Sequence, residues 1–400
     1  MENNEQKVIL KVEDLSMYFK MGTHTLKAVD HVNFEIHEGE VFGLVGESGC
    51  GKTTTGRTII KLYEATGGNV YFKGQRICAG TLDYKETIKK CREALKNKEL
   101  SVEEVENLNK QIAEAKEQIK LAKFDNKNCN NEYIDKCTND VKEKYEPLLA
   151  KASEEEAAEL RREYKDALKV AKNERLVNGI QMIFQDPIGS LDPRMTVREI
   201  ISEGLAIKGV KNKKIIDETV YDVLEKVGLV KQHANRYPHE FSGGQRQRIG
   251  VARSMTMKPS LIIADEPVSA LDVSIQAQVI NLLDDLRHET NLAILFIAHD
   301  LSVVKYFSDK IGVMYFGKMV ELATSDELFA HPCHPYTRAL LSAIPVPDPN
   351  YEKNRKRLIY NPVRDHDYRS QAPYMQEVYP GHYVLCNDEE KERFLKEYEG

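Results

Sequence analysis

The sequence predicts an α/β protein on a largely parallel sheet, with one long helical segment interrupting the domain. Short apolar runs alternate with glycine and charged turns from Lys7 to about Ile77, and this texture returns from Ile180 onward. Helical stretches such as Ser274 to His288 separate the later runs, and strands that alternate with helices favour parallel pairing. Between about Ala79 and Val177 the chain is rich in Lys, Glu, Ala and Leu, which is a helical composition.

Composition indicates a globular chain and excludes several classes of function. Its 400 residues are 41% hydrophobic, which is enough for a buried core. The longest apolar run, Asn291 to Ala298, suits a buried strand and is too short to cross a bilayer. Acidic residues stand at the start where a signal peptide carries basic ones, so we expect no export. A net charge of -6 provides no basic surface, so we expect no nucleic-acid partner.

A glycine-rich loop follows the apolar run Val41 to Val45 and fits the pattern G-x-x-x-x-G-K-[ST]. The loop contains, in order, Gly46, Glu47, Ser48, Gly49, Cys50, Gly51, Lys52, Thr53 and Thr54. Between a strand and a helix, such a loop turns its backbone N–H groups around the β- and γ-phosphates of a nucleotide. Lys52 supplies a positive charge and the Thr53 hydroxyl is a ligand for Mg²⁺. The loop therefore predicts an ATP site.

Two adjacent carboxylates end a second buried strand. The apolar run Leu261 to Ala264 is followed directly by Asp265 and Glu266. Ligands of open α/β sheets bind at this carboxyl end of the strands. Neighbouring side chains on an extended chain point in different directions, so the two carboxylates are suited to different roles. We expect Asp265 to hold Mg²⁺ through water and Glu266 to deprotonate the attacking water.

The segment Phe241 to Arg248 carries a family resemblance. Its core, Ser242-Gly243-Gly244-Gln245 after Phe241, resembles the LSGGQ signature of ABC transporter ATPases, with Phe in the first place. A Ser hydroxyl and Gly-Gly amides at a helix start form an anion site. The resemblance implies an ABC cassette with a RecA-like parallel core, an antiparallel β subdomain and a helical subdomain that holds the signature. It also implies that the signature serves the nucleotide of a second subunit.

The other elements of the family pattern follow in order. The resemblance assigns Gln185 to the Q-loop, Asp272 to the D-loop and His299 to the switch histidine. Tyr18 matches the aromatic residue that stacks on adenine, and Phe19 is a weaker candidate for that role. The implied catalytic residues are Glu266, His299 and Gln185; the Mg²⁺ ligands are Thr53, Gln185 and Asp265; the ATP contacts are Tyr18, residues 46–54, Gln185 and Asp265.

Two further segments resemble the oligopeptide and dipeptide permease ATPases, and in particular the F-type member of the pair. They are QDPIGSLDPRMTVREII, which starts at Gln185, and HPCHPYTRALLSAIPVPDP, which starts at His331. The resemblance covers about three-quarters of the chain, all but the insertion and the extreme tail. It implies a peptide importer at the cytoplasmic face of the membrane. Its expected partners are a second similar ATPase, two permease subunits and an extracytoplasmic peptide-binding protein.

The cysteines depart from the family pattern. Relatives often hold an iron–sulfur cluster near a terminal PGHxVAC, and this chain has Cys386 in PGHYVLC but no cysteine from Asn361 to Val378. The usual cluster needs four ligands, so we expect no iron–sulfur cluster. Cys78, Cys91, Cys129 and Cys137 fit no metal-binding spacing. Seven cysteines without a CxxC pair are typical of free thiols in a reducing cytoplasm.

The helical segment itself shows two amphipathic stretches. Each begins with a capping box, Ser101 to Glu104 and Ser153 to Glu156, and then places apolar residues at steps of three and four. Residues 125–140 between them are rich in turn formers. We therefore expect one antiparallel hairpin that projects from the edge of the cassette. The sequence leaves open whether this hairpin docks a partner or has no binding role.

These observations divide the chain into four parts: the first part of the cassette (1–78), the inserted hairpin (79–177), the rest of the cassette (178–330) and a C-terminal extension (331–400). Nickel importers use closely similar ATPases, so the cargo stays open. Coiled-coil chromosome or repair ATPases place a far longer coil after the Q-loop, whereas here the helical segment precedes Gln185. Translation-factor ABC proteins carry two cassettes, whereas this chain has one phosphate loop and one signature.

Overall fold

Two sheets form the body of the protein. The computed structural model describes residues 7–96, 100–269, 271–344 and 357–399. The smaller sheet is antiparallel, with strand order β2-β1-β4-β5. Its strands are β1 (Val8–Met21), β2 (His24–His37), β4 (Gly67–Phe72) and β5 (Gln75–Ala79).

The larger sheet is mixed and has the order β11-β12-β10-β9-β3-β8-β7-β6. Its bounds are β3 (Val41–Val45), β6 (Ile180–Ile183), β7 (Leu261–Asp265), β8 (Ala293–Ala298), β9 (Lys310–Tyr315), β10 (Lys318–Thr324), β11 (Tyr374–Tyr379) and β12 (His382–Cys386). The strands from β9 to β6 are parallel, and those from β10 to β11 are antiparallel. Every residue of β3, β7 and β8 is buried, as expected for parallel strands covered on both faces. The predicted α/β fold is confirmed.

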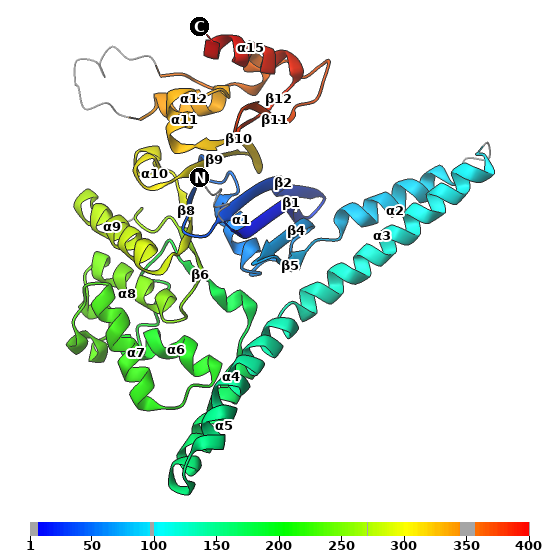
Figure 1. The fold of residues 1–400 in the computed structure, drawn as a ribbon. Helices are drawn as coiled ribbons and strands as arrows, with labels where there is room; N and C mark the ends of the chain where they lie inside the picture. The colour runs from blue at the N-terminus through cyan, green and yellow to red at the C-terminus, as the bar shows by residue number, and fades with distance from the viewer. Residues whose placement is uncertain (1–6, 97–99, 270, 345–356, 400) are drawn as a thin grey trace.

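Helices cover the larger sheet and form a separate group below it (Figure 1). Helices α6, α7 and α8 pack on one another, and α8 also contacts α9 and β6. The helices of the cassette and C-terminal region are α1 (Lys52–Ile59), α6 (Val197–Lys208), α7 (Lys213–Lys226), α8 (Gly243–Met255), α9 (Val273–Thr290), α10 (Leu301–Phe307), α11 (Ser325–Ala330), α12 (Pro335–Ser342), α14 (Pro362–Asp365) and α15 (Asp388–Glu399). Short 3₁₀ turns are η1 (Leu176–Gly179), η2 (Lys231–Asn235) and η3 (Pro238–Glu240). Within the described residues, no helix combines the length and apolar character that crossing a membrane requires.

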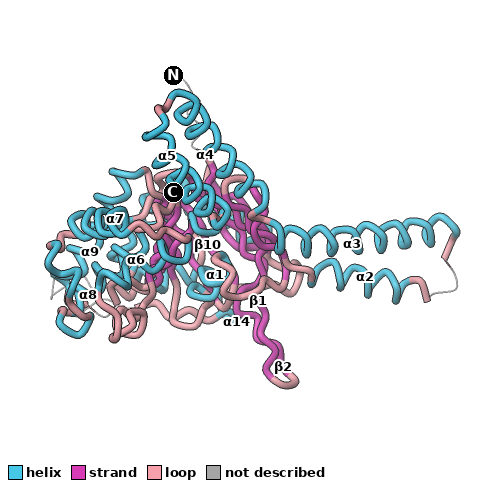
Figure 2. The backbone as a smooth tube through the Cα atoms, turned by 90° about the horizontal axis from the view of Figure 1, so that it is seen from below, coloured by secondary structure: helices cyan, strands magenta, loops and turns pink. Residues whose placement is uncertain are grey.

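The inserted segment forms two helix pairs, not one. Helix α2 (Leu82–Ala94) packs against α3 (Val102–Asn128), and α4 (Asn131–Lys151) packs against α5 (Glu154–Asn173). The first pair projects as an arm away from the sheets, and the second lies on the side of α6 and α7 (Figures 1 and 2). Both predicted capping boxes are confirmed. The predicted reversal within residues 125–140 is wrong, because the chain there stays helical apart from a short break between α3 and α4.

Polar residues at that break attach the insertion to the cassette. The side chain of Asn126 donates to the carbonyl oxygen of Ala79 at 2.8 Å and accepts from its N–H at 2.8 Å. Arg76 donates to Asp125 at 2.7 Å, and the Asn130 side chain accepts from the N–H of Leu176 at 2.8 Å. The Asn and Asp residues that predicted a turn therefore bind the backbone and side chains of neighbouring strands and turns. Sequence spacing cannot separate these two uses of the same residues.

We predict that Asn126→Ala lowers the free energy of unfolding by about 1 to 3 kcal/mol, because it leaves two buried backbone groups of Ala79 without partners. Denaturant unfolding measures this change. The control is Asn128→Ala, which removes only exposed hydrogen bonds, one to Phe124 in the same helix and one from Asn131. Equal effects of the two substitutions would contradict the anchoring role of Asn126.

Candidate nucleotide site

Four predicted motifs meet at one edge of the larger sheet because their strands are parallel neighbours. The glycine-rich loop follows β3, the carboxylate pair ends β7, and His299 follows β8. Gln185 follows β6, which pairs with β7. The carboxyl ends of parallel strands lie at the same edge, so the fold itself collects these side chains.

The glycine-rich loop has the backbone shape that only glycine allows at two positions. Gly46 has φ 148° and Gly51 has φ 110°. A Cβ at Gly46 would lie 2.2 Å from the Met314 carbonyl oxygen, and one at Gly51 would lie 2.2 Å from the Ala28 carbonyl oxygen. Any other residue is excluded at both positions by backbone atoms that cannot move aside. Glu47, Ser48 and Gly49 at the crown are exposed, so a ligand can reach them.

Lys52 and Thr53 hold the loop and connect it to β7. The buried ammonium of Lys52 donates to the carbonyl oxygens of Gly46 at 2.7 Å and Glu47 at 3.0 Å. The Thr53 hydroxyl donates to Asp265 Oδ1 at 2.7 Å. Burial raises the pKa of Asp265, and the bond from Thr53 opposes that shift. Asp265 Oδ2 is buried without a hydrogen-bond partner. A hydroxyl beside a buried, incompletely paired carboxylate suits a hydrated Mg²⁺ ion.

Glu266 is the point where three motifs converge. Its Oε2 accepts from Gln185 Nε2 at 3.0 Å and lies 3.5 Å from His299 Nδ1. Its backbone has φ 46°, a left-handed conformation that is strained for Glu. The Glu266 N–H donates to the Ile297 carbonyl oxygen at 2.9 Å, which fixes the turn. Gln185, predicted as a Mg²⁺ ligand, contacts Glu266 rather than Thr53 or Asp265 in the described part of the chain.

Tyr18 and Phe19, the two candidates for stacking on adenine, lie in different surroundings. Phe19 packs edge-on against Tyr63 and joins the buried cluster below the small sheet. Tyr18 faces the other way, and its hydroxyl donates to Asp30. The ammonium of Lys27 lies 5.0 Å from the centre of the Tyr18 ring. An adenine that stacks on Tyr18 must therefore take the other face of the ring or displace Lys27.

The signature lies on the helical group, away from the loop of its own chain (Figure 1). Ser242 is the N-cap of α8, where its Oγ accepts from the Gln245 N–H at 3.4 Å, and both Ser242 and Gly243 are exposed. A Cβ at Gly244 would lie 2.5 Å from Ile275 Cγ2, so glycine is what lets α8 approach α9. Asp272, the predicted D-loop residue, is exposed at the N-cap of α9.

Sequence reasoning missed one residue of the site. The hydroxyl of Tyr336, in α12, accepts from the N–H of Glu47 at 2.9 Å. Tyr336 is buried, and its ring contacts those of Tyr315 and Tyr360 at 4.5 and 5.5 Å between centroids. The HPYTR motif marked the segment, but its tyrosine lies 289 residues from Glu47, so no local pattern could pair them.

Comparison with protein families gives two matches. The family model described as ABC transporter matches residues 29–138 and 147–269. The model described as the C-terminal region of oligopeptide/dipeptide transporters matches residues 320–368. The second match includes Tyr336 and the segment that carries it.

Among curated relatives, the oligopeptide transport ATP-binding protein OppF of Bacillus subtilis (strain 168) is 46% identical over 387 residues, covering 96% of this chain and 98% of the relative. OppF of Streptococcus mutans is 44% identical over 398 residues, covering 99% and 100%. The dipeptide transport ATP-binding protein DppF of Lactococcus lactis is 40% identical, covering 98% of each.

Solved structures confirm the fold. A structure of cbiO1 from Clostridium perfringens, titled as part of the ABC transporter complex cbiONQ, has a TM-score of 0.51 and 20% identity. It covers 81% of this chain and 92% of its own. The ATP-binding cassette MJ0796 in a post-hydrolysis state has a TM-score of 0.51 and 21% identity, covering 79% of this chain and 99% of its own.

We predict that Tyr336→Phe weakens ATP binding about two- to fivefold, because the Glu47 N–H loses its hydrogen bond to the buried tyrosine and the loop is held less firmly. Nucleotide titration of the purified chain measures the change. The control is Tyr360→Phe, since that hydroxyl contacts His366 and not the loop. Unchanged affinity in Tyr336→Phe, or an equal loss in the control, would contradict a positioning role for Tyr336.

Proposed function

Because this chain belongs to the ABC transporter family, we propose that it is the ATP-binding and ATP-hydrolysing subunit of an importer of oligopeptides or dipeptides. The observation that carries the proposal is the meeting of the glycine-rich loop, the carboxylate pair, Gln185 and His299 at one sheet edge, in a chain that also matches the peptide-transporter C-terminal region. The names of the relatives at 40% to 46% identity support peptide as the cargo. The alternative, a nickel or other solute importer, would use the same nucleotide site, so the residues of that site do not distinguish the cargo.

We assign ATP binding to the glycine-rich loop and the side chains around it. The backbone N–H groups of the loop and the Lys52 ammonium hold the β- and γ-phosphates, while Tyr18 stacks on adenine. The proposed ligands of Mg²⁺ are Thr53, Asp265 and the amide oxygen of Gln185, and the hydrogen bond between Thr53 and Asp265 supports the first two. A Mg²⁺ ion held by these residues would neutralise phosphate charge.

We assign the role of catalytic base in ATP hydrolysis to Glu266. Its carboxylate accepts a proton from the water that attacks the γ-phosphorus, and the bond from phosphorus to the β-γ bridging oxygen breaks to leave ADP. Gln185 and His299 already contact Glu266, so they orient the base and the water between them. His299 is more than half exposed, which leaves it able to face the γ-phosphate.

A second subunit completes each site. We propose that Ser242, Gly243, Gly244 and Gln245 bind the γ-phosphate of ATP held by a partner's loop, with Asp272 at the contact between subunits. The exposed helix start at Ser242 and Gly243 supports this, because the N–H groups in the first turn of a helix have no carbonyl partner within that helix. The partner is a similar ATPase in a heterodimer.

The remaining partners are two permease subunits and an extracytoplasmic peptide-binding protein, and the chain works at the cytoplasmic face of the membrane. Residues 186–197, after Gln185, would receive a coupling helix of the permease and convert closure of the ATPase pair into channel opening. No nucleic-acid partner is proposed. The division into 1–78, 79–177, 178–330 and 331–400 is supported by strands β5 and β6, which lie just before and after the inserted helices.

We predict that Glu266→Gln leaves ATP binding near normal and lowers ATP turnover of the assembled transporter by at least about 100-fold, because only the proton acceptor is lost. Uptake of a labelled oligopeptide should stop with it. The control is Glu289→Gln, an exposed residue at the end of α9. Near-normal ATP turnover in Glu266→Gln would contradict the role of Glu266 as the proton acceptor. Uptake of nickel in place of peptide would contradict the proposed cargo.

We predict that Ser242→Arg abolishes ATP crosslinking to the partner's phosphate loop and spares this chain's own loop. The variant is combined with wild-type partner and permeases, and photoreactive labelled ATP reports on each subunit. Ser101→Arg is the control, since it disrupts an equivalent capping box on the projecting arm. Loss of ATP only from this chain's own loop would contradict the shared site.

A further inference from the structure

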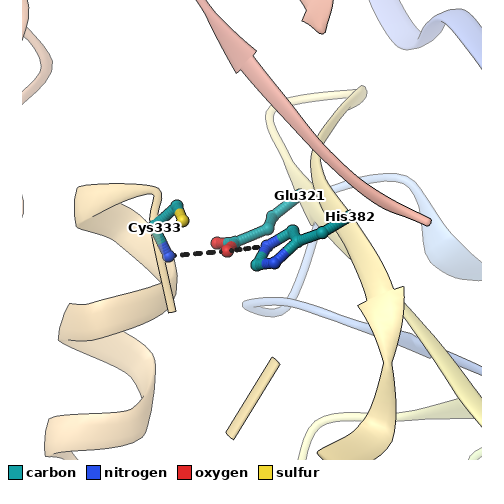
Figure 3. Close-up of side chains that lie close together, drawn as sticks. All are labelled: Glu321, Cys333 and His382. Carbon is teal, nitrogen blue, oxygen red and sulfur yellow. Dashed lines mark hydrogen bonds and ion pairs between the residues drawn. The ribbon is translucent and has the colours of Figure 1, made fainter. Parts of the chain in front are cut away.

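Three chemically distinct side chains meet inside the C-terminal region, outside the nucleotide site (Figure 3). Glu321 comes from β10, Cys333 from the segment between α11 and α12, and His382 from β12. One carboxylate oxygen, the sulfur and a ring nitrogen all lie within 4.8 Å of one another. All three residues are buried, with exposed fractions of 0%, 4% and 0%. Among the described residues, only this group of His, Cys, Asp and Glu side chains has metal-ligand spacing.

The cluster contains a carboxylate that is held inside the protein by three donors. Glu321 Oε1 accepts from the Cys333 N–H at 2.7 Å and lies 2.8 Å from His382 Nε2. Its Oε2 accepts from the His334 N–H at 3.0 Å. An ionised carboxylate with no exposure is stable only when it is paired in this way. Glu321 is therefore a fixed hydrogen-bond acceptor at the centre of the group.

The imidazole of His382 lies between two carboxylates. Its Nε2 faces Glu321, and its Nδ1 lies 3.5 Å from Glu327 Oε1. Burial disfavours the charged ring, but the hydrogen bonds and charges of Glu321 and Glu327 outweigh burial and raise the pKa of His382. A ring with an acceptor at each nitrogen needs either a second proton or a cation at Nε2. A metal-bound histidine usually donates its other N–H to a carboxylate, and Glu327 is in that place.

Cys333 supplies the third ligand type. Its sulfur makes only a weak bond, to the His331 carbonyl oxygen at 3.5 Å. Burial and the charge of Glu321 raise the pKa of Cys333 to about 12, so the metal-free thiol keeps its proton. Thiolate is a metal ligand where the thiol is not, and a bound cation removes the proton.

We propose that Glu321, Cys333 and His382 form a binding site for a divalent metal ion of the zinc type. Without metal, the acceptors at both ring nitrogens favour the doubly protonated imidazole of His382, and the Cys333 thiol keeps its proton. Binding releases the Nε2 proton of His382 and the thiol proton of Cys333. The two positive charges of the metal ion replace the charges of these two protons. The net charge of the buried site is the same before and after, which avoids the cost of an unpaired interior charge.

The ligand set selects the class of metal. Sulfur, nitrogen and oxygen together suit Zn²⁺, whereas Mg²⁺ and Ca²⁺ prefer oxygen alone. A tetrahedral zinc ion holds its ligand atoms roughly 3.3 to 3.7 Å apart, so small side-chain rotations close the observed spacing. The metal would tie β10, β12 and the HPCHPY segment together, and that segment leads directly into Tyr336 beneath the phosphate loop.

The test is equilibrium dialysis of the full chain against Zn²⁺, with bound metal measured by mass spectrometry. Wild type should bind one ion, and Cys333→Ser should weaken zinc binding by more than roughly 100-fold. Loss of a residue that only hydrogen-bonds to a metal ligand weakens binding by no more than about that factor. The matched control is Cys386→Ser, because Cys386 is buried in the same apolar cluster and lies outside the ligand group. Circular dichroism verifies that each variant is folded.

Two further readouts separate a ligand from a structural residue. Zinc binding in weakly buffered solution should release about two protons per ion in wild type. Co²⁺ in place of Zn²⁺ should give a thiolate charge-transfer band that Cys333→Ser loses and Cys386→Ser keeps. Zinc binding that survives Cys333→Ser, or that falls equally in Cys386→Ser, would overturn the assignment. So would iron with the visible absorbance of a cluster.

Discussion

The parallel pairing of β3, β8 and β7 is the constraint on which the rest of the site depends. Adjacent parallel strands end at the same edge, so the phosphate loop, His299 and the carboxylate pair become neighbours although they are far apart in sequence. The bond from Thr53 to Asp265 joins helix α1, which follows the loop after β3, to the end of β7. A shift of one strand by one residue would turn these side chains away from each other.

Backbone strain at the site is offset by the same sheet. Glu266 holds a left-handed conformation, which costs of order 1 to 3 kcal/mol for a non-glycine residue. Its N–H bonds the carbonyl oxygen of Ile297 in β8, and its carbonyl oxygen accepts from Ser269, so the turn is fixed on both sides. The strain directs the carboxylate toward Gln185 and His299 and away from Asp265. Two adjacent carboxylates thereby occupy different surroundings, one buried beside Thr53 and one facing Gln185 and His299.

The sequence could predict what depends on contiguous residues. The phosphate loop, the carboxylate pair, the signature and both capping boxes are short patterns whose geometry is local, and the structure places each on the expected strand or helix end. It could not predict contacts that link distant segments. Tyr336 reaches Glu47 only because the C-terminal region folds back against the edge of the large sheet. The helix pairs of the insertion were predicted wrongly because Asn126 and Asn130 serve as anchors where their composition indicates a turn.

The C-terminal region acts on the site through packing. Strand β12 pairs with β10 and extends the large sheet, so the sheet edge that β10 would expose is covered. Glu321 in β10 receives the N–H groups of Cys333 and His334, which fixes the start of α12. From that fixed start the helix positions Tyr336 to accept from Glu47. The buried group around Glu321 is thus connected through one short helix to the glycine-rich loop. The region that matches the peptide-transporter family model therefore contacts the glycine-rich loop directly.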